Sequence, residues 1–208
     1  MEVIKDFHGR GYTMGEFVQT IRNGKAKKLF SLLDAITVEG KEYEIVSFED
    51  DAVVFMGKEL LPERRMFEDY CGIGMDYRDS DLRKWLNDVY FQTLPEVLRD
   101  AITPTPLSCT NENKLKKYDE ADMLFLPSES EIFGRVFFSS SMDGKPFAAL
   151  GVAQNRLRFN TKGHEKFYWT RSKTRYNYEL FVFVLSDGIV YNCYATNECY
   201  VPVCFRIA

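Results

Sequence analysis

The sequence has no long apolar run and no regularly spaced cysteines, and each absence excludes a class of protein. The longest uncharged apolar run, Leu180 to Leu185, has six residues, whereas a membrane-spanning helix needs ~20. The five cysteines are odd in number and lack C-x-x-C spacing, which argues against a disulfide framework and a structural zinc site. The N-terminus is charged where a signal peptide is apolar. We therefore expect a chain made in the cytoplasm, without membrane insertion, and leave open whether it acts on a virion or a cell surface.

Signatures of catalysis are also missing. The sequence contains no G-x-S-x-G, no phosphate-binding glycine loop and no H-E-x-x-H. The two histidines, His8 and His164, have no second metal ligand at a suitable spacing. The net charge of −4 opposes binding to a phosphate backbone. These absences predict a protein that is not an enzyme and has no metal, no cofactor and no nucleic-acid partner.

The composition is that of one packed domain. Hydrophobic residues make up 45% of the 208 residues and aromatic residues 15%. Residues 1–34 are predicted to form a helical lead-in, because Thr13 and Glu16 match a capping box and an apolar helical face follows them. Residues 35–208 are predicted to form the main domain.

The main domain combines helix and strand patterns. Strands are predicted over 35–38, 43–46, 52–56, 123–126, 167–170, 180–185, 189–194 and 200–207. A helix capped at Asp79 or Ser80 is predicted to bury Leu82, Trp85, Leu86, Val89 and Tyr90, and a helix from Pro95 to bury Val97, Leu98, Ala101 and Ile102. Ser128 and Glu131 form a second capping box, residues 108–120 read as an exposed loop, and Asp187-Gly188 predicts a hairpin turn. Early helices followed by antiparallel strands predict an α+β fold.

Tyrosine and asparagine are concentrated near the C-terminus. Six of the twelve tyrosines lie within residues 168–200. Tyrosine offers a large rigid contact area with a polar tip, and Asn, Ser and Thr add adaptable hydrogen bonds, as binding surfaces require. The strand preference of tyrosine accounts for Tyr168 and Tyr200, but less well for the tyrosines that flank turns. The candidate ligand-binding residues are therefore Thr174, Tyr176, Asn177, Tyr178, Tyr191, Asn192, Tyr194, Thr196 and Asn197.

Cys199 and Cys204 lie five residues apart near the end of the chain. On a regular strand such residues face opposite sides, so a shared copper site or disulfide needs a bulge or bend. Pro202 between them makes such an irregularity conceivable. Without it, Cys204 is an ordinary buried strand residue, which the pattern favours.

Four separate motifs resemble an uncharacterised domain family of bacteria and their prophages, from about residue 35 to the end. Asp79-Ser-Asp-Leu-Arg-Lys-Trp-Leu-Asn87 is similar to its "S-x-L-R-x-W-L-N" helix, and Asp122-Met-Leu-Phe-Leu-Pro-Ser-Glu-Ser-Glu131 to its "D-x-x-F-L-L-S-x-x-E" segment. Tyr168-Trp-Thr-Arg-Ser172 resembles "W-W-L-R-S", and Leu185-Ser-Asp-Gly-Ile-Val190 with Val201-Pro-Val-Cys-Phe-Arg-Ile207 resembles the closing hairpin and "V-R-P-A-L" strand. The sequence departs from the family at Thr170 and at Pro202-Val203, and it lacks the calcium-binding signatures of lectins.

That family is related to the formylglycine-generating branch of the C-type lectin fold. The resemblance implies two main helices packed on a twisted antiparallel sheet with long loops. The same fold carries the variable proteins of diversity-generating retroelements, in which a reverse transcriptase rewrites the C-terminal coding segment at adenines. The resemblance thus implies a variable segment over about residues 168–208, with fixed scaffold positions such as Trp169, Gly188 and Val201 between the changing ones.

Three functional hypotheses follow. The first is a non-enzymatic protein that binds a protein or other surface ligand through its tyrosine-rich C-terminal face. The second is a copper-dependent oxidase that resembles formylglycine-generating enzymes and uses Cys199 and Cys204. The third is a structural phage or cell-surface component with fixed contacts. The sequence does not determine the oligomeric state.

Overall fold

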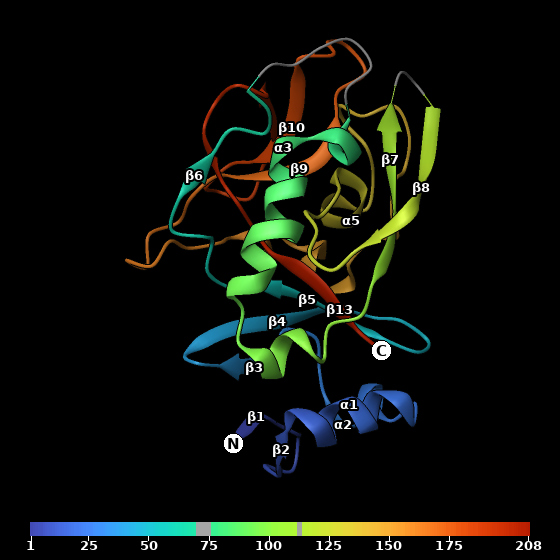
Figure 1. The fold of residues 1–208 in the computed structure, drawn as a ribbon, viewed down its shortest axis with the longest axis vertical. Helices are drawn as coiled ribbons and strands as arrows, with labels where there is room; N and C mark the ends of the chain where they lie inside the picture. The colour runs from blue at the N-terminus through green and yellow to red at the C-terminus, as the bar shows by residue number, and fades with distance from the viewer. Residues whose placement is uncertain (70–75, 112–113) are drawn as a thin grey trace.

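The computed structural model describes the backbone of residues 1–69, 76–111 and 114–208. Helices and strands are both present, so the chain is α+β as the sequence pattern predicts. In Figure 1 one of the two main sheets crosses the middle of the molecule, the other lies toward the top, and the N-terminal helices lie at the bottom.

The strands form two main sheets and two hairpins in the described part of the chain. The four-stranded sheet has the order β13-β5-β4-β3, with β3 (Ala35–Val38), β4 (Lys41–Phe48), β5 (Val53–Gly57) and β13 (Cys204–Ile207). The five-stranded sheet has the order β11-β10-β9-β12-β6, with β6 (Arg64–Arg65), β9 (Tyr168–Lys173), β10 (Leu180–Val184), β11 (Val190–Tyr194) and β12 (Cys199–Tyr200). The hairpins pair β1 (Glu2–Lys5) with β2 (Gly11–Thr13), and β7 (Thr105–Asn111) with β8 (Lys114–Asp122).

The helices are short, and side chains cap several of them. Their bounds are α1 (Met14–Arg22), α2 (Ala26–Leu29), η1 (Tyr77–Asp79), α3 (Asp81–Lys84), η2 (Trp85–Tyr90), η3 (Phe91–Thr93), α4 (Glu96–Arg99), α5 (Glu129–Phe133), η4 (Ala148–Gly151) and η5 (Ala153–Arg156). Both predicted capping boxes are confirmed, that of Thr13 at α1 and that of Ser128 at α5. Within the residues described, no helix has both the length and the apolar character needed to cross a membrane.

The helical run α3-η2-η3 begins at the predicted cap, Ser80, but buries fewer residues than predicted. Leu82 and Leu86 are buried, whereas Trp85 is half-buried and Val89 is exposed. The reason is that η2 is a π-helix, whose wider i→i+5 turn rotates later residues off the face set by a 3.6-residue period. In the short α4, Leu98 is buried and Val97 is exposed, so that prediction was also wrong at one position.

One loop prediction and two strand predictions are corrected by the structure. Residues 108–111 and 114–120, predicted as part of a loop, lie on β7 and β8, and residues 112–113 lie outside the described residues. Residues 123–126 form no continuous strand, and only Phe125 makes an isolated bridge, to Cys204. The predicted strand 200–207 is split into β12 and β13, which belong to different sheets. Pro202 lies in the break, where its missing N–H removes no ladder bond.

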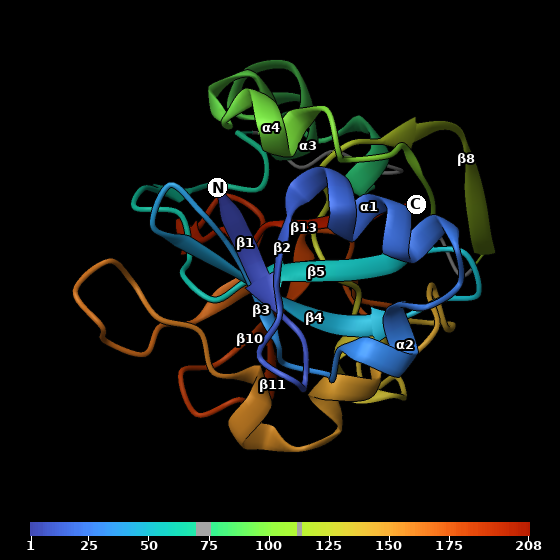
Figure 2. The ribbon, with the colours of Figure 1, turned by 90° about the horizontal axis from the view of Figure 1, so that it is seen from below.

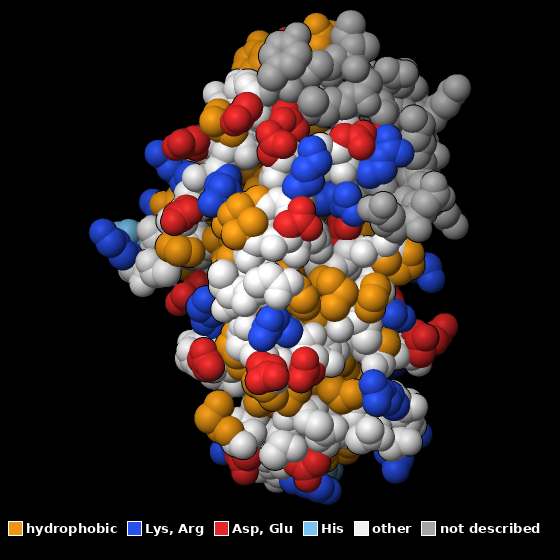
Figure 3. Space-filling view, in the orientation of Figure 1, with side chains coloured by type: hydrophobic (Ala, Val, Ile, Leu, Met, Phe, Trp, Pro, Cys, Tyr) orange, Lys and Arg blue, Asp and Glu red, His pale blue; other side chains and the backbone are white. Residues whose placement is uncertain are grey.

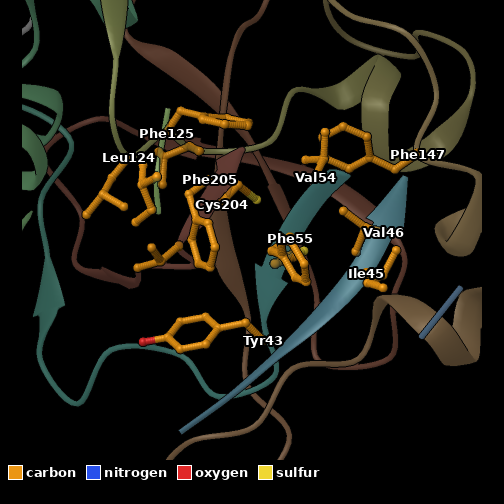
Figure 4. Packing of buried hydrophobic residues seen from close by; sticks show 14 of the residues in the cluster. Tyr43, Ile45, Val46, Val54, Phe55, Leu124, Phe125, Phe147, Cys204 and Phe205 are labelled. Carbon is orange, nitrogen blue, oxygen red and sulfur yellow. The ribbon is translucent and has the colours of Figure 1, made fainter. Parts of the chain in front are cut away.

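One hydrophobic core joins the lead-in to the main domain. Phe17 of α1 is fully buried, and its ring lies 5.9 Å from that of Phe55 on β5. Phe55 in turn stacks on Phe205 of β13 at 5.3 Å. Figure 2 shows α1 and α2 lying against the sheet that contains β4 and β5, and Figure 4 shows the packing around Phe55 and Phe205. Residues 1–34 therefore pack against the four-stranded sheet.

Candidate functional site

The β10–β11 hairpin carries the centre of the predicted binding surface. Its strands pair in regular antiparallel register, from Leu180 opposite Tyr194 to Val184 opposite Val190. The turn lies where the sequence predicts it, and Gly188 adopts a φ of 80°, which an L side chain would strain. β11 lies at the edge of the five-stranded sheet, so the hairpin places its outer strand at the surface.

Four of the candidate tyrosines are exposed. Tyr176, Tyr178, Tyr191 and Tyr194 expose between 46% and 68% of their surface. In contrast, Tyr168 is fully buried and Tyr200 is half-buried, as their strand positions predict. Thr196 and Asn197 are exposed in the turn after β11, and Asn192 is half-buried. We call the loop 174–179, β11 and the turn 195–198 together the tyrosine surface.

Two candidate residues shape the loop 174–179 through hydrogen bonds to its backbone. Thr174 is buried, and its hydroxyl donates to the Asn177 carbonyl at 2.8 Å. The Asn177 side chain accepts a hydrogen bond from the Glu179 N–H at 2.9 Å. Such bonds from a side chain to nearby backbone build tight turns. Thr174 and Asn177 thus position Tyr176 between them.

The exposed tyrosines of β11 lie on opposite faces of the sheet. Tyr191 is directly opposite Phe183, and their rings meet edge to face at 6.0 Å. Tyr194 is opposite Leu180, three residues further along β11, and therefore projects from the other face. The ring of Phe138 lies 6.5 Å from that of Tyr191 and extends the aromatic surface beyond the hairpin.

A buried carboxylate holds Phe138 in this position. The Glu129 side chain accepts hydrogen bonds from the backbone N–H groups of Phe137, Phe138 and Ser139, each at 2.9 Å. The backbone carbonyl of Phe138 also accepts from the N–H of Arg175 at 2.9 Å. The capping box predicted at Ser128 and Glu131 gives no sign of this contact of Glu129, because the capping pattern is local and the loop is eight or more residues away.

A second buried carboxylate, Glu131, anchors β9 beneath the tyrosine surface. The guanidinium of Arg171 donates to the two oxygens of Glu131 at 2.6 and 2.7 Å, and to the carbonyls of Leu126 and Asp143 at 2.8 and 2.7 Å. Arg171 is fully buried, so this paired geometry supplies the partners that its charge requires. The network fixes β9, the strand that neighbours β10.

The structure separates the two cysteines of the oxidase hypothesis. Cys199 lies on β12 and Cys204 on β13, in different sheets. Cys199 pairs with Arg65 of β6, and Cys204 pairs with Met56 of β5. Burial raises the pKa of both thiols far above their ordinary value, which disfavours the thiolate that binds copper. Cys71 lies outside the described residues, and within them no cluster of three or more His, Cys, Asp or Glu forms a metal site.

A cavity of about 320 Å³ lies between β6 and α3, and Glu198 of the tyrosine surface forms part of its wall. In its wall the Asp81 N–H donates to the Glu68 carboxylate at 3.1 Å, and the Arg65 guanidinium lies 3.6 Å from the centre of the Trp85 ring. Burial, together with a side-chain hydrogen bond to Asp81, raises the pKa of Glu68 to about 7. Because Glu68 satisfies the first N–H of α3, helix capping accounts for this geometry.

Charge is mixed over the face shown in Figure 3, where Lys and Arg side chains alternate with Asp and Glu.

Residues 51–208 match the model of a family described as Domain of unknown function (DUF6273). No curated protein and no solved structure matches the chain.

Proposed function

From the premise that the chain belongs to the DUF6273 family, whose description gives no function, we propose that it is a non-enzymatic ligand-binding protein. Its ligand is a protein or another surface ligand, and the tyrosine surface is the binding site. The observation that carries the proposal is the exposure of Tyr176, Tyr178, Tyr191 and Tyr194 on a closely packed scaffold. Large apolar side chains in such a position cost free energy in water and gain it on contact with a partner.

The scaffold beneath the tyrosines supports this proposal. The hydrogen bonds of Thr174, Asn177 and Glu129 order the loops before any ligand binds. Loops that are already ordered lose less conformational entropy on binding, which leaves more of the contact energy for affinity. Tyrosine also has only two side-chain torsions to fix.

The resemblance to retroelement variable proteins supplies a finer proposal. According to this finer proposal, the main domain has a C-type lectin-like architecture. The codons for the tyrosine surface then differ between copies of the gene. Sequencing many copies of the 3′ end tests this directly. Differences confined to adenine positions of a nearby repeat, with a reverse-transcriptase gene beside it, are expected. An invariant 3′ end without such a repeat would instead favour fixed contacts, as in a structural phage or surface component.

The binding proposal is tested with displayed libraries of random peptides and with a glycan array. We expect the wild-type protein to retain members of one of these collections. Replacing Tyr176, Tyr178, Tyr191 and Tyr194 with Ala should weaken that binding at least tenfold, since truncating a central aromatic contact costs ~2 kcal/mol or more. Phe7→Ala is the matched control, because Phe7 is 57% exposed but lies in the N-terminal lead-in. Unchanged binding by the quadruple variant, or unfolding of that variant, would contradict the proposal.

A further inference from the structure

The outer edge of β11 presents unused backbone hydrogen-bonding groups. The Leu185 N–H donates to the Ile189 carbonyl at 2.8 Å, and the Ala195 N–H donates to the Glu179 carbonyl at 2.9 Å. In an antiparallel ladder, bonded and non-bonded residues alternate. Residues 189, 191, 193 and 195 therefore turn their backbone groups toward β10, and Val190, Asn192 and Tyr194 turn theirs outward. The Tyr194 carbonyl accepts from the Asn197 N–H at 2.9 Å, so the open part of the edge is centred on Val190 and Asn192. Among the described elements, β10 is the strand that pairs with β11.

Two other sheet edges are protected in ways that β11 is not. At the opposite edge of the same sheet, β6 has only two residues, and both are arginine. The outer side of β13 is occupied, because the Thr103 N–H donates to the Arg206 carbonyl at 2.8 Å and Phe125 bridges Cys204. Short length, charge and covering segments are the usual means by which proteins prevent an edge from pairing. In β11, by contrast, residues 189–197 contain no charge and no proline.

The side chains of β11 suit an added strand. Tyr191 and Tyr194 project from opposite faces and are both exposed, so each would flank one face of a strand placed beside Asn192. Cross-strand contacts between aromatic and β-branched side chains stabilise such pairs by about 0.2–1 kcal/mol each. Backbone hydrogen bonds would supply affinity, and the tyrosines would select alternate side chains of the partner.

Charge favours a foreign segment over a second copy. Residues 174–198 contain three acidic residues, Glu179, Asp187 and Glu198, and one basic residue, Arg175, so their net charge is −2. Pairing two copies of this hairpin would bring acidic segments together, although Arg64 offsets Glu198 at 3.4 Å. An extended segment with basic residues beside an uncharged centre has the complementary charge.

We propose that β11 binds an extended peptide segment of a partner protein by strand addition to the five-stranded sheet. The segment is uncharged over about five residues, carries β-branched or aromatic side chains at alternate positions and has Lys or Arg beside them. This inference rests on the proposed function and specifies the partner of the same surface.

The test uses a displayed library of random peptides flanked by lysines, with full-length protein as bait. Asn192→Pro removes an outward N–H without removing a bond to β10, and edge strands tolerate such a proline. Asn192→Ala is the matched control, because it removes the same side chain and keeps the N–H. We expect peptides enriched on the wild-type protein to bind Asn192→Pro at least tenfold more weakly than Asn192→Ala, a difference that isolates the Asn192 N–H from its side chain. Equal binding to the two variants, or no enriched peptide, would overturn the inference.

A second measurement does not depend on the folding of a variant. Each enriched peptide is synthesised with N-methyl groups on alternate backbone nitrogens, in either of two registers. Strand addition predicts that one register abolishes binding and the other spares it, because only alternate N–H groups face β11. Equal effects of the two registers would exclude strand addition.

Two further outcomes separate this inference from the proposed function. Glycan binding that requires the four tyrosines, with no peptide binding, leaves the proposed function intact and overturns strand addition. A wild-type dimer in sedimentation that Asn192→Pro dissociates assigns the edge to a second copy and likewise overturns the inference. If the wild-type protein binds no member of the peptide libraries and no glycan of the array, both proposals are refuted.

Discussion

Single residues show where local sequence patterns reach their limit. The sequence predicts nine binding residues from composition, and four of its tyrosines are indeed exposed. It cannot separate Thr174 and Asn177 from them, because threonine and asparagine serve turns as readily as binding surfaces. The decisive facts are the burial of Thr174 and its hydrogen bond to Asn177, which depend on how the loop packs. Whether the exposed tyrosines contact a ligand stays a prediction.

The residue with the clearest pH response is Glu68. Burial and the side-chain hydrogen bond to Asp81 raise its pKa from 4.5 to about 7 in the folded protein. The folded state therefore holds a proton that the unfolded state releases at lower pH, and stability falls as the pH rises from about 4.5 to about 7. We expect Glu68→Gln, which keeps a neutral hydrogen-bonding side chain, to remove this part of the pH dependence.

Urea unfolding of the wild-type protein and Glu68→Gln at pH 5 and pH 8 measures the effect. The unfolding free energy of the wild-type protein should fall from pH 5 to pH 8 by more than that of Glu68→Gln. Glu63→Gln, which alters an exposed carboxylate, serves as control. Parallel pH profiles of the wild-type protein and Glu68→Gln would show that Glu68 is not the group responsible.

Elements defined by local chemistry could be predicted, and elements defined by distant contacts could not. The capping boxes of α1 and α5, the strands β3 and β4 and the turn at Gly188 all follow from residues within a few positions of each other. The π-helix η2 and the division of the last strand between two sheets depend on packing against segments far away in the sequence. The periodicity of hydrophobic residues predicts burial only for a helix of constant pitch and for a strand that stays in one sheet. It therefore fails for η2 and for the last strand.

The turn of the β10–β11 hairpin requires glycine for two separate reasons. Gly188 has a φ of 80°, and a Cβ there would lie 2.7 Å from the Ala153 carbonyl oxygen. Gly163 has a φ of 75°, but a Cβ there would lie in open space, more than 4 Å from the described residues beyond its chain neighbours. Gly163→Ala should therefore cost about 1–2 kcal/mol from backbone conformation alone. Gly188→Ala should cost at least about 1 kcal/mol more, because backbone must move to relieve the contact.

Thermal and urea unfolding of the two alanine variants measure this difference. Since the turn holds β11 in register, Gly188→Ala should also weaken binding at the tyrosine surface, whereas Gly163→Ala should not. Equal destabilisation of the two variants would mean that the approach of Ala153 to the turn is absent in solution.

The whole molecule is arranged with its N-terminal lead-in and its five-stranded sheet at opposite ends of the long axis (Figure 1). The four-stranded sheet between them contains β3 and β4, which precede the family match that begins at residue 51, and β5 and β13, which lie within it. The chain outside the match thus supplies half of the strands in this sheet. A single core runs from α1 through β5 to β13, so the lead-in supports the domain from the end opposite the five-stranded sheet.

Removing the lead-in should therefore lower stability and leave the chemistry of the tyrosine surface unchanged. Phe17→Ala removes a fully buried ring that packs on Phe30 and Phe55, and such truncations cost about 3–5 kcal/mol. Deletion of residues 1–34 exposes Phe55 and should produce a larger loss, together with binding of a hydrophobic dye. Phe7→Ala, at a largely exposed position, should change stability by less than about 0.5 kcal/mol.

Urea unfolding ranks the three variants, and peptide binding below the unfolding transition should be equal for Phe17→Ala and the wild-type protein. A deletion variant as stable as the full chain would show that residues 1–34 form a separate attachment element, because a packed lead-in cannot be removed without exposing the sheet that it covers.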